Sequence, residues 1–458
     1  MGPPKGSSHV ATIFVHAGAG YHSFQNERIH LEACENAARV AMALLRNGGT
    51  AVDAVEIAIM LLEDTEITNA GYGSNLTLQG AVECDATLVD HMGRSGAAGA
   101  VTLVKNPISL ARVILETSSK PLSLQRVPPN FLVGPGATDF AYDNGLVVLP
   151  PDALISPPSK ERWTRWQQEI ASIDLQEKQP EDYRSWFLRR PVTLNPSLLL
   201  ASPNSMQHSS PIDQPVSGDM QSSTPIQEKS QTSVSEVKYS DGVEEFLRHA
   251  NSRSSRTAHR LNPDASNDAN ADNITDTVGA IAIDCYGNIA AGSSSGGIGM
   301  KHRGRVGPAA LVGIGTTVIP VDPNDPDGTS VAVVTSGTGE HIATTLAAST
   351  CASRIYHPTK RTSSGAQEEA MEEEVIFDMI ATDFMGHPGV RSSPCPAAIG
   401  LMAVKKTNDG VFLYFGHNTD SFALASMSSE DSQPACVMSR SNGSGTIAQG
   451  GRAYRLKR

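Results

Sequence analysis

Several features are scarce in this chain, and each scarcity excludes a class of protein. Aromatic residues make up only 5% of the 458 residues, too few for an aromatic binding platform. Lys and Arg number 36 against 48 Asp and Glu, and the net charge of −12 leaves no basic face for a nucleic acid. No uninterrupted apolar run approaches the roughly 18 residues that a membrane span needs. Binding to nucleic acid or to membranes is therefore not expected.

Cysteines are also few, and none of the six follows CxxC spacing. This pattern excludes a zinc motif and a disulfide scaffold, and it predicts reduced thiols. The first nine residues are polar and lack the apolar core of a signal peptide. We therefore expect a soluble, intracellular protein of the cytoplasm, the nucleus or both. The basic residues at 452–458 do not decide between these compartments, and surface solvation is their expected role.

Strand and helix patterns occupy both ends of the chain. Apolar residues recur at helical spacing over residues 27–47, and Gly48 with Gly49 supplies the stop. Thr50 and Asp53 form a capping-box pattern that opens a second helix, which runs to residue 62. Further helices are expected at 106–115, 137–143, 161–177 and 340–352. Strands are expected at 12–16 (followed by a turn at 17–20), 81–89, 99–104, 277–284, 288–294, 331–335, 397–404, 411–416 and 421–427, the last of which closes the chain.

The middle of the chain has a different composition. From about residue 201 to 273 it turns to Ser, Pro, Gln, Asn and Asp, with few apolar residues. Such a segment cannot bury enough surface to offset its ordering entropy, so we expect a disordered insert with one helical turn at 243–248. The acidic run at 368–374 is expected to be a solvated helix face. The prediction is one α/β domain built from residues 1–200 and 277–458, joined by a linker at 201–276.

Order returns abruptly at Thr277, directly after Asp276. If the chain is cut before this threonine, one residue carries both a hydroxyl nucleophile and a free α-amine. A threonine hydroxyl is a weak nucleophile until a base removes its proton, and an N-terminal amine can be that base. The unperturbed pKa of the amine is about 7.7–8.0, so much of it is neutral near physiological pH. Taken alone, Asp-Thr-Val-Gly is also typical of an ordinary strand start.

Two glycine-rich loops with small hydroxyls follow Thr277. They are Ser-Gly-Gly at 295–297 and Ser-Gly-Thr-Gly-Glu at 336–340, and their glycines let backbone N–H groups approach a developing oxyanion. Between them lies Arg305, whose guanidinium can hold a carboxylate in a bidentate fork. None of these loops carries the lysine of a P-loop, which argues against phosphate binding. Together they predict an acyl-transfer site that serves a single nucleophile.

With these residues the chain resembles the N-terminal-nucleophile asparaginase family, also called the plant-type asparaginases, and within it most closely the threonine aspartases (taspases). The resemblance extends over about residues 12–151 and 276–427, which is most of the foldable sequence. The matching stretches are HAGAG at 16–20, LED at 62–64, NAG at 69–71, GSN at 73–75, VECDA at 82–86, KNP at 105–107, FLVG at 131–134, DTVG at 276–279, SGG at 295–297, GRVG at 304–307 and SGTGE at 336–340.

The resemblance implies an architecture and a processing step. The fold would be an α/β (α+β) N-terminal-nucleophile hydrolase, a four-layer αββα sandwich with two stacked sheets. The precursor would cut itself between Asp276 and Thr277 into α and β subunits that remain associated. The processed αβ units would pair as a homodimer.

The resemblance also assigns roles to individual residues. Thr277 would be the nucleophile, and Ser295 would be a second hydroxyl near it. Ser336 and the N–H of Gly337 would stabilise the oxyanion. Arg305 would grip the substrate carboxylate. The resulting mechanism requires no cofactor and no metal.

Two departures from the small-molecule asparaginases bear on the substrate. Those enzymes follow Arg-Val-Gly with an aspartate that holds the α-ammonium of the substrate, but this chain has Pro308. A buried ammonium would then stay unpaired, which is costly, whereas a peptide-linked aspartate has no such ammonium. The asparaginase precursors usually have glycine before the threonine, but this chain has Asp276, as in the threonine aspartases.

The predicted function is therefore a threonine endopeptidase that cleaves itself between Asp276 and Thr277 and then cleaves protein substrates after aspartate. An asparaginase or isoaspartyl peptidase of the same fold is the first alternative. An uncleaved, inactive family member that serves as a binding scaffold is the second.

Overall fold

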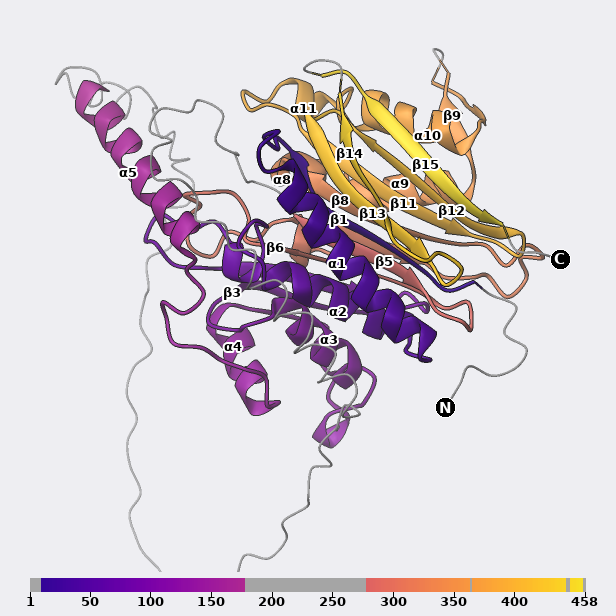
Figure 1. Cartoon of the computed structure of the whole chain (residues 1–458), viewed down its shortest axis with the longest axis horizontal. Coiled ribbons are helices and arrows are strands. Elements are labelled where there is room, and N and C mark those ends of the chain that lie inside the picture. Colours follow the sequence, from indigo (N-terminus) through magenta and orange to yellow (C-terminus); the bar gives the residue numbers. More distant parts are fainter. Residues whose placement is uncertain (1–9, 178–276, 363–364, 442–444, 456–458) are drawn as a thin grey trace, which may run out of the picture. The chain divides into compact units, whose positions relative to one another are not determined.

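The structure is a computed structural model that describes residues 10–177, 277–362, 365–441 and 445–455 (Figure 1). The described residues up to 171 and from 277 onward belong to one compact unit. Of a second unit, Ser172–Pro263, only the end of one helix is described. The expected insert at 201–273, its helical turn at 243–248 and Asp276 lie outside the described residues. The domain boundaries at 200 and 276 therefore stay predictions.

Two β-sheets form the centre of the fold. The larger sheet has eight strands in the order β14-β13-β1-β5-β6-β2-β3-β4, antiparallel except for the β3–β4 pair. Its strands are β1 (Thr12–Gly20), β2 (Cys84–Val89), β3 (Ser95–Val101), β4 (Phe131–Val133), β5 (Val278–Ile283), β6 (Ile289–Ser295), β13 (Ser421–Ser428) and β14 (Ala435–Arg440). The second sheet has the order β15-β12-β11-β8-β7 and is antiparallel throughout. Its strands are β7 (Thr316–Ile319), β8 (Ser330–Gly337), β11 (Ile399–Lys406), β12 (Gly410–His417) and β15 (Ala448–Arg455), and a small separate hairpin joins β9 (Thr359–Arg361) to β10 (Gln367–Glu369).

Helices cover the outer faces of both sheets (Figure 1). The α-helices in the described residues are α1 (Glu27–Arg46), α2 (Ala51–Glu63), α3 (Pro107–Thr117), α4 (Gly134–Asp143), α5 (Pro157–Glu177), α8 (Gly339–Thr344), α9 (Ala347–Tyr356), α10 (Glu372–Asp378) and α11 (Pro388–Arg391). Short 3-10 turns lie at η1 (Gly71–Gly73), η2 (Ser123–Gln125) and η4 (Pro308–Ala310), and a π-helical turn, η5 (Met379–Phe384), follows α10. The capping box is present as expected: Asp53 N–H donates to the Thr50 hydroxyl at 3.2 Å.

The packing of β8 shows how the layers are ordered. Side chains alternate between the two faces of a strand. Val331 and Val333 join a core with α9, α10 and η5, whereas Ala332 and Val334 join a core with the larger sheet. On the far side of the larger sheet, α2 lies so close to β6 that a Cβ on Gly292 would be 2.8 Å from the Val55 side chain. The order helix, sheet, sheet, helix confirms the expected four-layer αββα sandwich.

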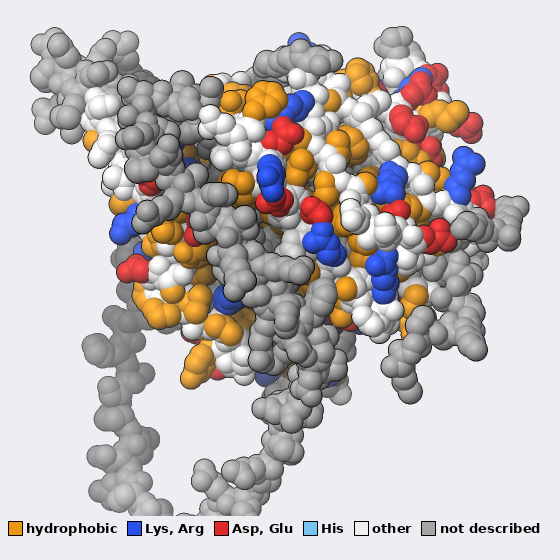
Figure 2. All heavy atoms as spheres, viewed as in Figure 1, with side chains coloured by type: hydrophobic (Ala, Val, Ile, Leu, Met, Phe, Trp, Pro, Cys, Tyr) orange, Lys and Arg blue, Asp and Glu red, His pale blue; other side chains and the backbone are white. Residues whose placement is uncertain are grey.

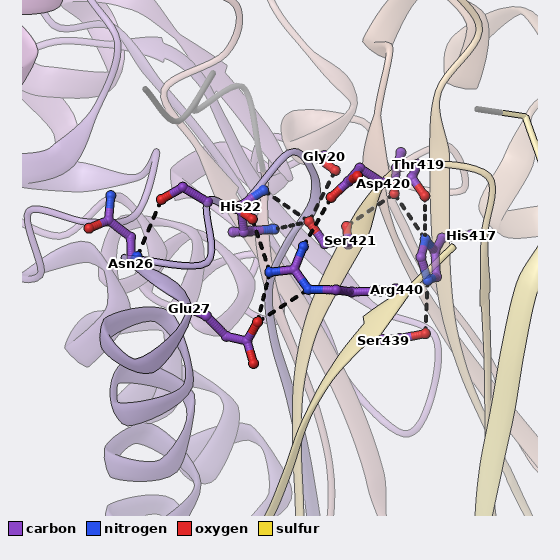
Figure 3. A network of polar contacts seen from close by, with 11 residues as sticks. Gly20, His22, Asn26, Glu27, His417, Thr419, Asp420, Ser421, Ser439 and Arg440 are labelled. Atoms are coloured by element: carbon purple, nitrogen blue, oxygen red, sulfur yellow. Dashed lines mark hydrogen bonds and ion pairs between the residues drawn. The ribbon is translucent and has the colours of Figure 1, made fainter. Parts of the chain in front are cut away.

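Segments from before and after the predicted cleavage site are interleaved. Strand β1 lies between β13 and β5, and β2 lies between β6 and β3. Figure 3 shows a further link, in which Arg440 of β14 donates to Glu27 Oε2 at 2.7 Å, to the His22 carbonyl at 3.1 Å and to Asp420 Oδ1 at 3.1 Å. The Arg440 guanidinium also lies 3.9 Å above the Phe24 ring. A break before Thr277 would therefore leave both parts held by whole strands and a polar network.

Several predicted elements are wrong in extent. The turn at 17–20 is absent because β1 continues to Gly20 through a bulge, where Gly18 has a φ of +113°. The helix at 340–352 is two helices, since Leu346 has a φ of +50° and the first N–H groups of α9 donate to Gly313 and Ile314. The strand at 99–104 lies at 95–101 instead.

The chain also continues beyond residue 427 with two strands, β14 and β15, that the sequence pattern does not indicate. Their side chains are mostly half-buried or exposed because both are edge strands. The acidic run at 368–374 is split between β10 and α10, so the single helix face is wrong. Its side chains are mostly exposed, and acidic groups gather where β9 and α10 lie (Figure 2).

All six cysteines are free thiols, and four of them are buried. Within the described ranges, no helix has both the length and the apolar character to cross a membrane. The same ranges hold no group of three or more His, Cys, Asp and Glu side chains placed to bind a metal ion.

Candidate active site

The predicted site residues gather at one end of the two sheets. Thr277 directly precedes β5, Ser295 ends β6, and Ser336 with Gly337 ends β8. Val278 pairs with Ser294 across β5 and β6, so Ser295 lies beside Thr277. Two surface cavities, of about 410 and 500 Å³, lie elsewhere and contain none of these residues. The site is therefore defined here by the strand ends that bring these residues together.

Ser336 contacts the main chain of Thr277. The Thr277 backbone nitrogen donates to Ser336 Oγ at 3.3 Å, and the Ala19 nitrogen donates to the same oxygen at 3.0 Å. Ser336 is fully buried, and Thr277 is 7% exposed. Ser336 Oγ thus accepts two hydrogen bonds and can still donate its own proton.

Gly337 has a backbone conformation that requires glycine. Its φ is +137°, and a Cβ there would collide with the Ala398 carbonyl oxygen of the neighbouring chain segment. Gly337 pairs with Ile399 of β11 in the strand register. The start of the loop that follows β8 is therefore held in place beside Ser336. The N–H of Gly337, which is predicted to stabilise the oxyanion, belongs to this segment.

The hydroxyl of Ser295 accepts a hydrogen bond from the Gly297 nitrogen at 3.0 Å. Asn69, in a second loop, holds this turn in place. Its side-chain Nδ2 donates to the Gly297 carbonyl at 2.8 Å, and its backbone carbonyl accepts from the Gly296 nitrogen at 2.7 Å. A Cβ on Gly296 would lie 2.5 Å from Ser74 Cβ, so only glycine fits this approach. Asn69 belongs to the NAG stretch at 69–71, and its role in holding this turn is not predictable from the sequence pattern.

Arg305 lies between the two glycine-rich loops. A Cβ on Gly297 or Gly307 would be 3.0 or 2.6 Å from its Nη1 atom, and a Cβ on Gly339 would be 2.5 Å from Nη2. Its Nε and Nη2 atoms donate to Oε1 of Glu340 at 3.0 and 2.9 Å. Glu340 also lies in the first turn of α8, where the helix dipole favours a negative charge. The ion pair with Arg305 is a second role that the helix pattern cannot indicate.

Two buried ionisable residues, Asp85 and Lys301, lie near Arg305 and are not predicted from the sequence. Asp85 is fully buried and accepts from the Ala100 and Gly307 nitrogens at 2.8 and 2.7 Å. Burial raises the pKa of Asp85, and the positive charge of Lys301 opposes this. Lys301, itself 2% exposed, donates to the Glu83 carbonyl at 2.6 Å, and burial lowers its pKa. These charges fix the loop that carries Arg305, because Asp85 holds Gly307.

His16 is the neutral aromatic neighbour of Thr277. Burial lowers the pKa of His16 to about 3, against an opposing effect of the Thr277 backbone. His16 pairs with Gly279 in the β1–β5 register, and a Cβ on Gly279 would collide with His16 Nε2. An uncharged imidazole and a glycine are therefore packed directly behind the candidate nucleophile.

The layers and this arrangement define a class of protein, the N-terminal-nucleophile hydrolase fold, with a threonine at the start of a central strand. Residues 9–186 and 219–407 match a family model described as asparaginase, which is most of the chain. The chain belongs to this asparaginase family.

Three similar curated proteins illustrate the relationship. The isoaspartyl peptidase/L-asparaginase of Mus musculus is 37% identical over 161 residues, 34% of this chain and 47% of the relative. That of Xenopus laevis is 27% identical over 332 residues, 72% and 71% of the two chains. A putative isoaspartyl peptidase/L-asparaginase of Dictyostelium discoideum is 25% identical over 375 residues, 79% and 84%. In the mammalian matches the chain spans about half the length of the relative.

Proposed function

We propose that this chain is a threonine endopeptidase of the threonine aspartase type, which cleaves itself between Asp276 and Thr277 and then cleaves protein substrates after aspartate. The main argument for a protein substrate is the position of Pro308. A Cβ on Gly339 would lie 2.5 Å from Arg305 Nη2 and 2.8 Å from Pro308 Cδ, so the buried proline ring lies beside the guanidinium. A ring without charge there cannot hold an α-ammonium, which favours a peptide-linked aspartate.

In the proposed self-cleavage, Thr277 Oγ attacks the carbonyl carbon of Asp276. The C–N bond breaks as the C–O bond forms, and the released nitrogen takes up a proton and becomes the α-amine of Thr277. Water then hydrolyses the ester, which gives a carboxylate on Asp276 and restores the threonine hydroxyl. The hydrogen bond from the Thr277 nitrogen to Ser336 supports this step because it holds that nitrogen in place.

In the proposed mature enzyme, the Thr277 amine takes the proton of its own hydroxyl. The oxygen attacks the backbone carbonyl of a substrate aspartate, whose side-chain carboxylate lies on Arg305. The proton of Ser336 and the N–H of Gly337 stabilise the oxyanion, and Ser295 lies beside the nucleophile. The amine of the leaving peptide takes up a proton, and water hydrolyses the ester. A homodimer of processed units completes the proposal.

A second candidate is an asparaginase or isoaspartyl peptidase. The names of the relatives described above favour it, and the comparisons therefore support it better than the endopeptidase. Only the substitution at Pro308 and the aspartate before Thr277 favour the endopeptidase. Both candidates share the nucleophile, the oxyanion donors and Arg305.

Two measurements separate these functions. The intact mass of purified protein is expected to show two fragments, one ending at Asp276 and one starting at Thr277. The cleaved protein is then given a peptide with an internal aspartate, the same peptide with asparagine, an isoaspartyl dipeptide and free asparagine. Cleavage of the aspartyl peptide alone supports the endopeptidase, and hydrolysis of the dipeptide or release of ammonia supports the second candidate. A chain that stays whole contradicts both.

A further inference from the structure

The Arg305–Glu340 ion pair joins a half-buried cation to an exposed anion. The Arg305 side chain is 16% exposed and that of Glu340 is 57% exposed. Both hydrogen bonds, from Nε and Nη2, converge on one carboxylate oxygen. An exposed ion pair of this kind adds little to stability. Its geometry is more informative, because it fixes which edge of the guanidinium stays available.

A guanidinium has five N–H donors arranged in a rigid fork. Glu340 occupies the side edge, made by Nε and Nη2, and leaves the end edge, made by Nη1 and Nη2. Gly297, Gly307 and Gly339 border that end edge so closely that a Cβ on any of them would come within 3.0 Å of Nη1 or Nη2. A carboxylate binds a guanidinium most strongly through two parallel N–H···O bonds. The free edge therefore offers such a pair on the side of the glycine loops.

We propose that Glu340 is a positioning residue that holds Arg305 with its end edge toward the carboxylate of the substrate aspartate. This inference rests on the proposed function, in which Arg305 binds that carboxylate. Glu340 acts through Arg305 and does not touch the substrate. It thereby contributes to the selection of aspartate over asparagine. Only a correctly oriented guanidinium can bind both oxygens of the aspartate carboxylate, and the asparagine amide has a single oxygen.

The charges around Arg305 decide which variants are informative. Lys301 and Asp85 lie beside it, and Glu83 lies beside Lys301, so Glu340 is one anion in a mixed set of charges. Loss of the Glu340 charge alone would make this set more positive by one charge and strengthen the attraction for any anion. Glu340→Gln keeps an acceptor oxygen in the same place and removes the charge. Glu340→Ala removes both, and Glu340→Asp keeps the charge on a side chain one methylene shorter.

The test measures kcat/KM of the self-cleaved full-length protein on an aspartyl peptide and on the same peptide with asparagine. We expect Glu340→Ala and Glu340→Asp to lower the aspartate-to-asparagine ratio about tenfold, mainly through KM on the aspartyl peptide. Glu340→Gln should keep the ratio within about threefold of wild type. A purely structural role would lower both substrates equally and leave the ratio unchanged, which would overturn the inference.

The matched control is Glu374→Ala. Glu374 also lies in the first turn of a short helix and pairs with a lysine, Lys360, at 2.8 Å, but that pair is remote from Arg305 in the fold. Its loss should leave the ratio unchanged. If wild type shows no preference for aspartate, the proposed function fails and the inference with it. If wild type prefers aspartate and Glu340→Ala and Glu340→Asp keep that preference, only the role of Glu340 is refuted.

Discussion

The backbone nitrogen of Thr277 and the hydroxyl of Ser336 are joined by a buried hydrogen bond of 3.3 Å. Under the proposed mechanism this nitrogen is an amide before self-cleavage and an amine afterwards. A donor bond from the amine to Ser336 leaves its lone pair free to take the threonine proton. The same serine thus connects the nucleophile to the predicted oxyanion donors at the end of β8.

Thr277→Ala removes the only atom that the proposal allows to attack the carbonyl of Asp276. We expect this variant to remain one chain of 458 residues, seen as a single species by intact mass and on a denaturing gel. Thr277→Ser keeps a hydroxyl and should still be cleaved, although more slowly. A Thr277→Ala protein that splits at the same bond would refute the assignment of the nucleophile.

Ser336→Ala removes the acceptor of two buried N–H groups, those of Thr277 and Ala19. Self-cleavage should slow by about a hundredfold or more, the usual effect of losing one oxyanion donor. Stability should fall by about 1–3 kcal/mol, since the two donors stay unsatisfied. The rate is measured by the loss of full-length chain with time, and stability by urea unfolding.

The control for Ser336 is Ser293→Ala. Ser293 lies in β6 of the larger sheet, is fully buried as Ser336 is, and shares a hydroxyl–hydroxyl hydrogen bond of 2.7 Å with Thr316. Its loss should lower stability with no comparable effect on the rate of self-cleavage. Equal slowing in both variants would show that any buried hydroxyl matters here, and would deprive Ser336 of a specific role.

Pro308→Asp restores a carboxylate at the position where the resemblance places the ammonium-binding residue. Under the endopeptidase proposal, this variant should gain hydrolysis of isoaspartyl dipeptide or asparagine, by about tenfold over wild type, because the substrate ammonium then has a partner. Pro308→Asn, of similar size but without charge, serves as the control. If wild type already hydrolyses these substrates as fast as Pro308→Asp does, Pro308 does not exclude them.

Local patterns were enough to predict much of the fold. The capping box of Thr50 and Asp53, the adjacent strands at 277–284 and 288–294 and the α1 helix each depend on residues close in sequence, and each is confirmed. The break at Leu346 could not be predicted in this way. The helix pattern runs through it, and the break is stabilised by hydrogen bonds from α9 to a distant loop.

In the candidate site, too, local sequence patterns predict some residues and miss others. The hydroxyls, glycines and Arg305 stand in short motifs, so their presence could be predicted together. The charges that arrange them could not, because Arg305 and Glu340 are 35 residues apart and Gly307 and Asp85 are 222 apart. Only the sheet order brings β2 and its Asp85 beside β6 and the loop after it. Pairings of this kind follow from topology, not from sequence pattern.

The last prediction concerns Glu63, a fully buried carboxyl at the end of α2. Its Oε1 accepts from the Ile108 nitrogen at 3.0 Å. Burial raises the pKa of Glu63 from 4.5 to about 8, despite hydrogen bonds that lower it. Between these two pH values the folded chain keeps a proton that the unfolded chain has released. This contribution to stability is therefore complete below pH 4.5 and is lost as pH rises through about 8.

Glu63→Gln should remove this pH dependence, because the amide keeps an acceptor for Ile108 and cannot lose a proton. Near pH 5 the thermal unfolding midpoints of wild type and variant should be close. Near pH 8.5 the variant should be the more stable by on the order of a few kcal/mol, since wild type then carries a buried charge or must hold an unfavourable proton. Glu161→Gln, at an exposed position of α5, should follow wild type at both pH values. A constant difference between Glu63→Gln and wild type from pH 5 to 8.5 would mean that Glu63 is ionised in the folded protein throughout this range.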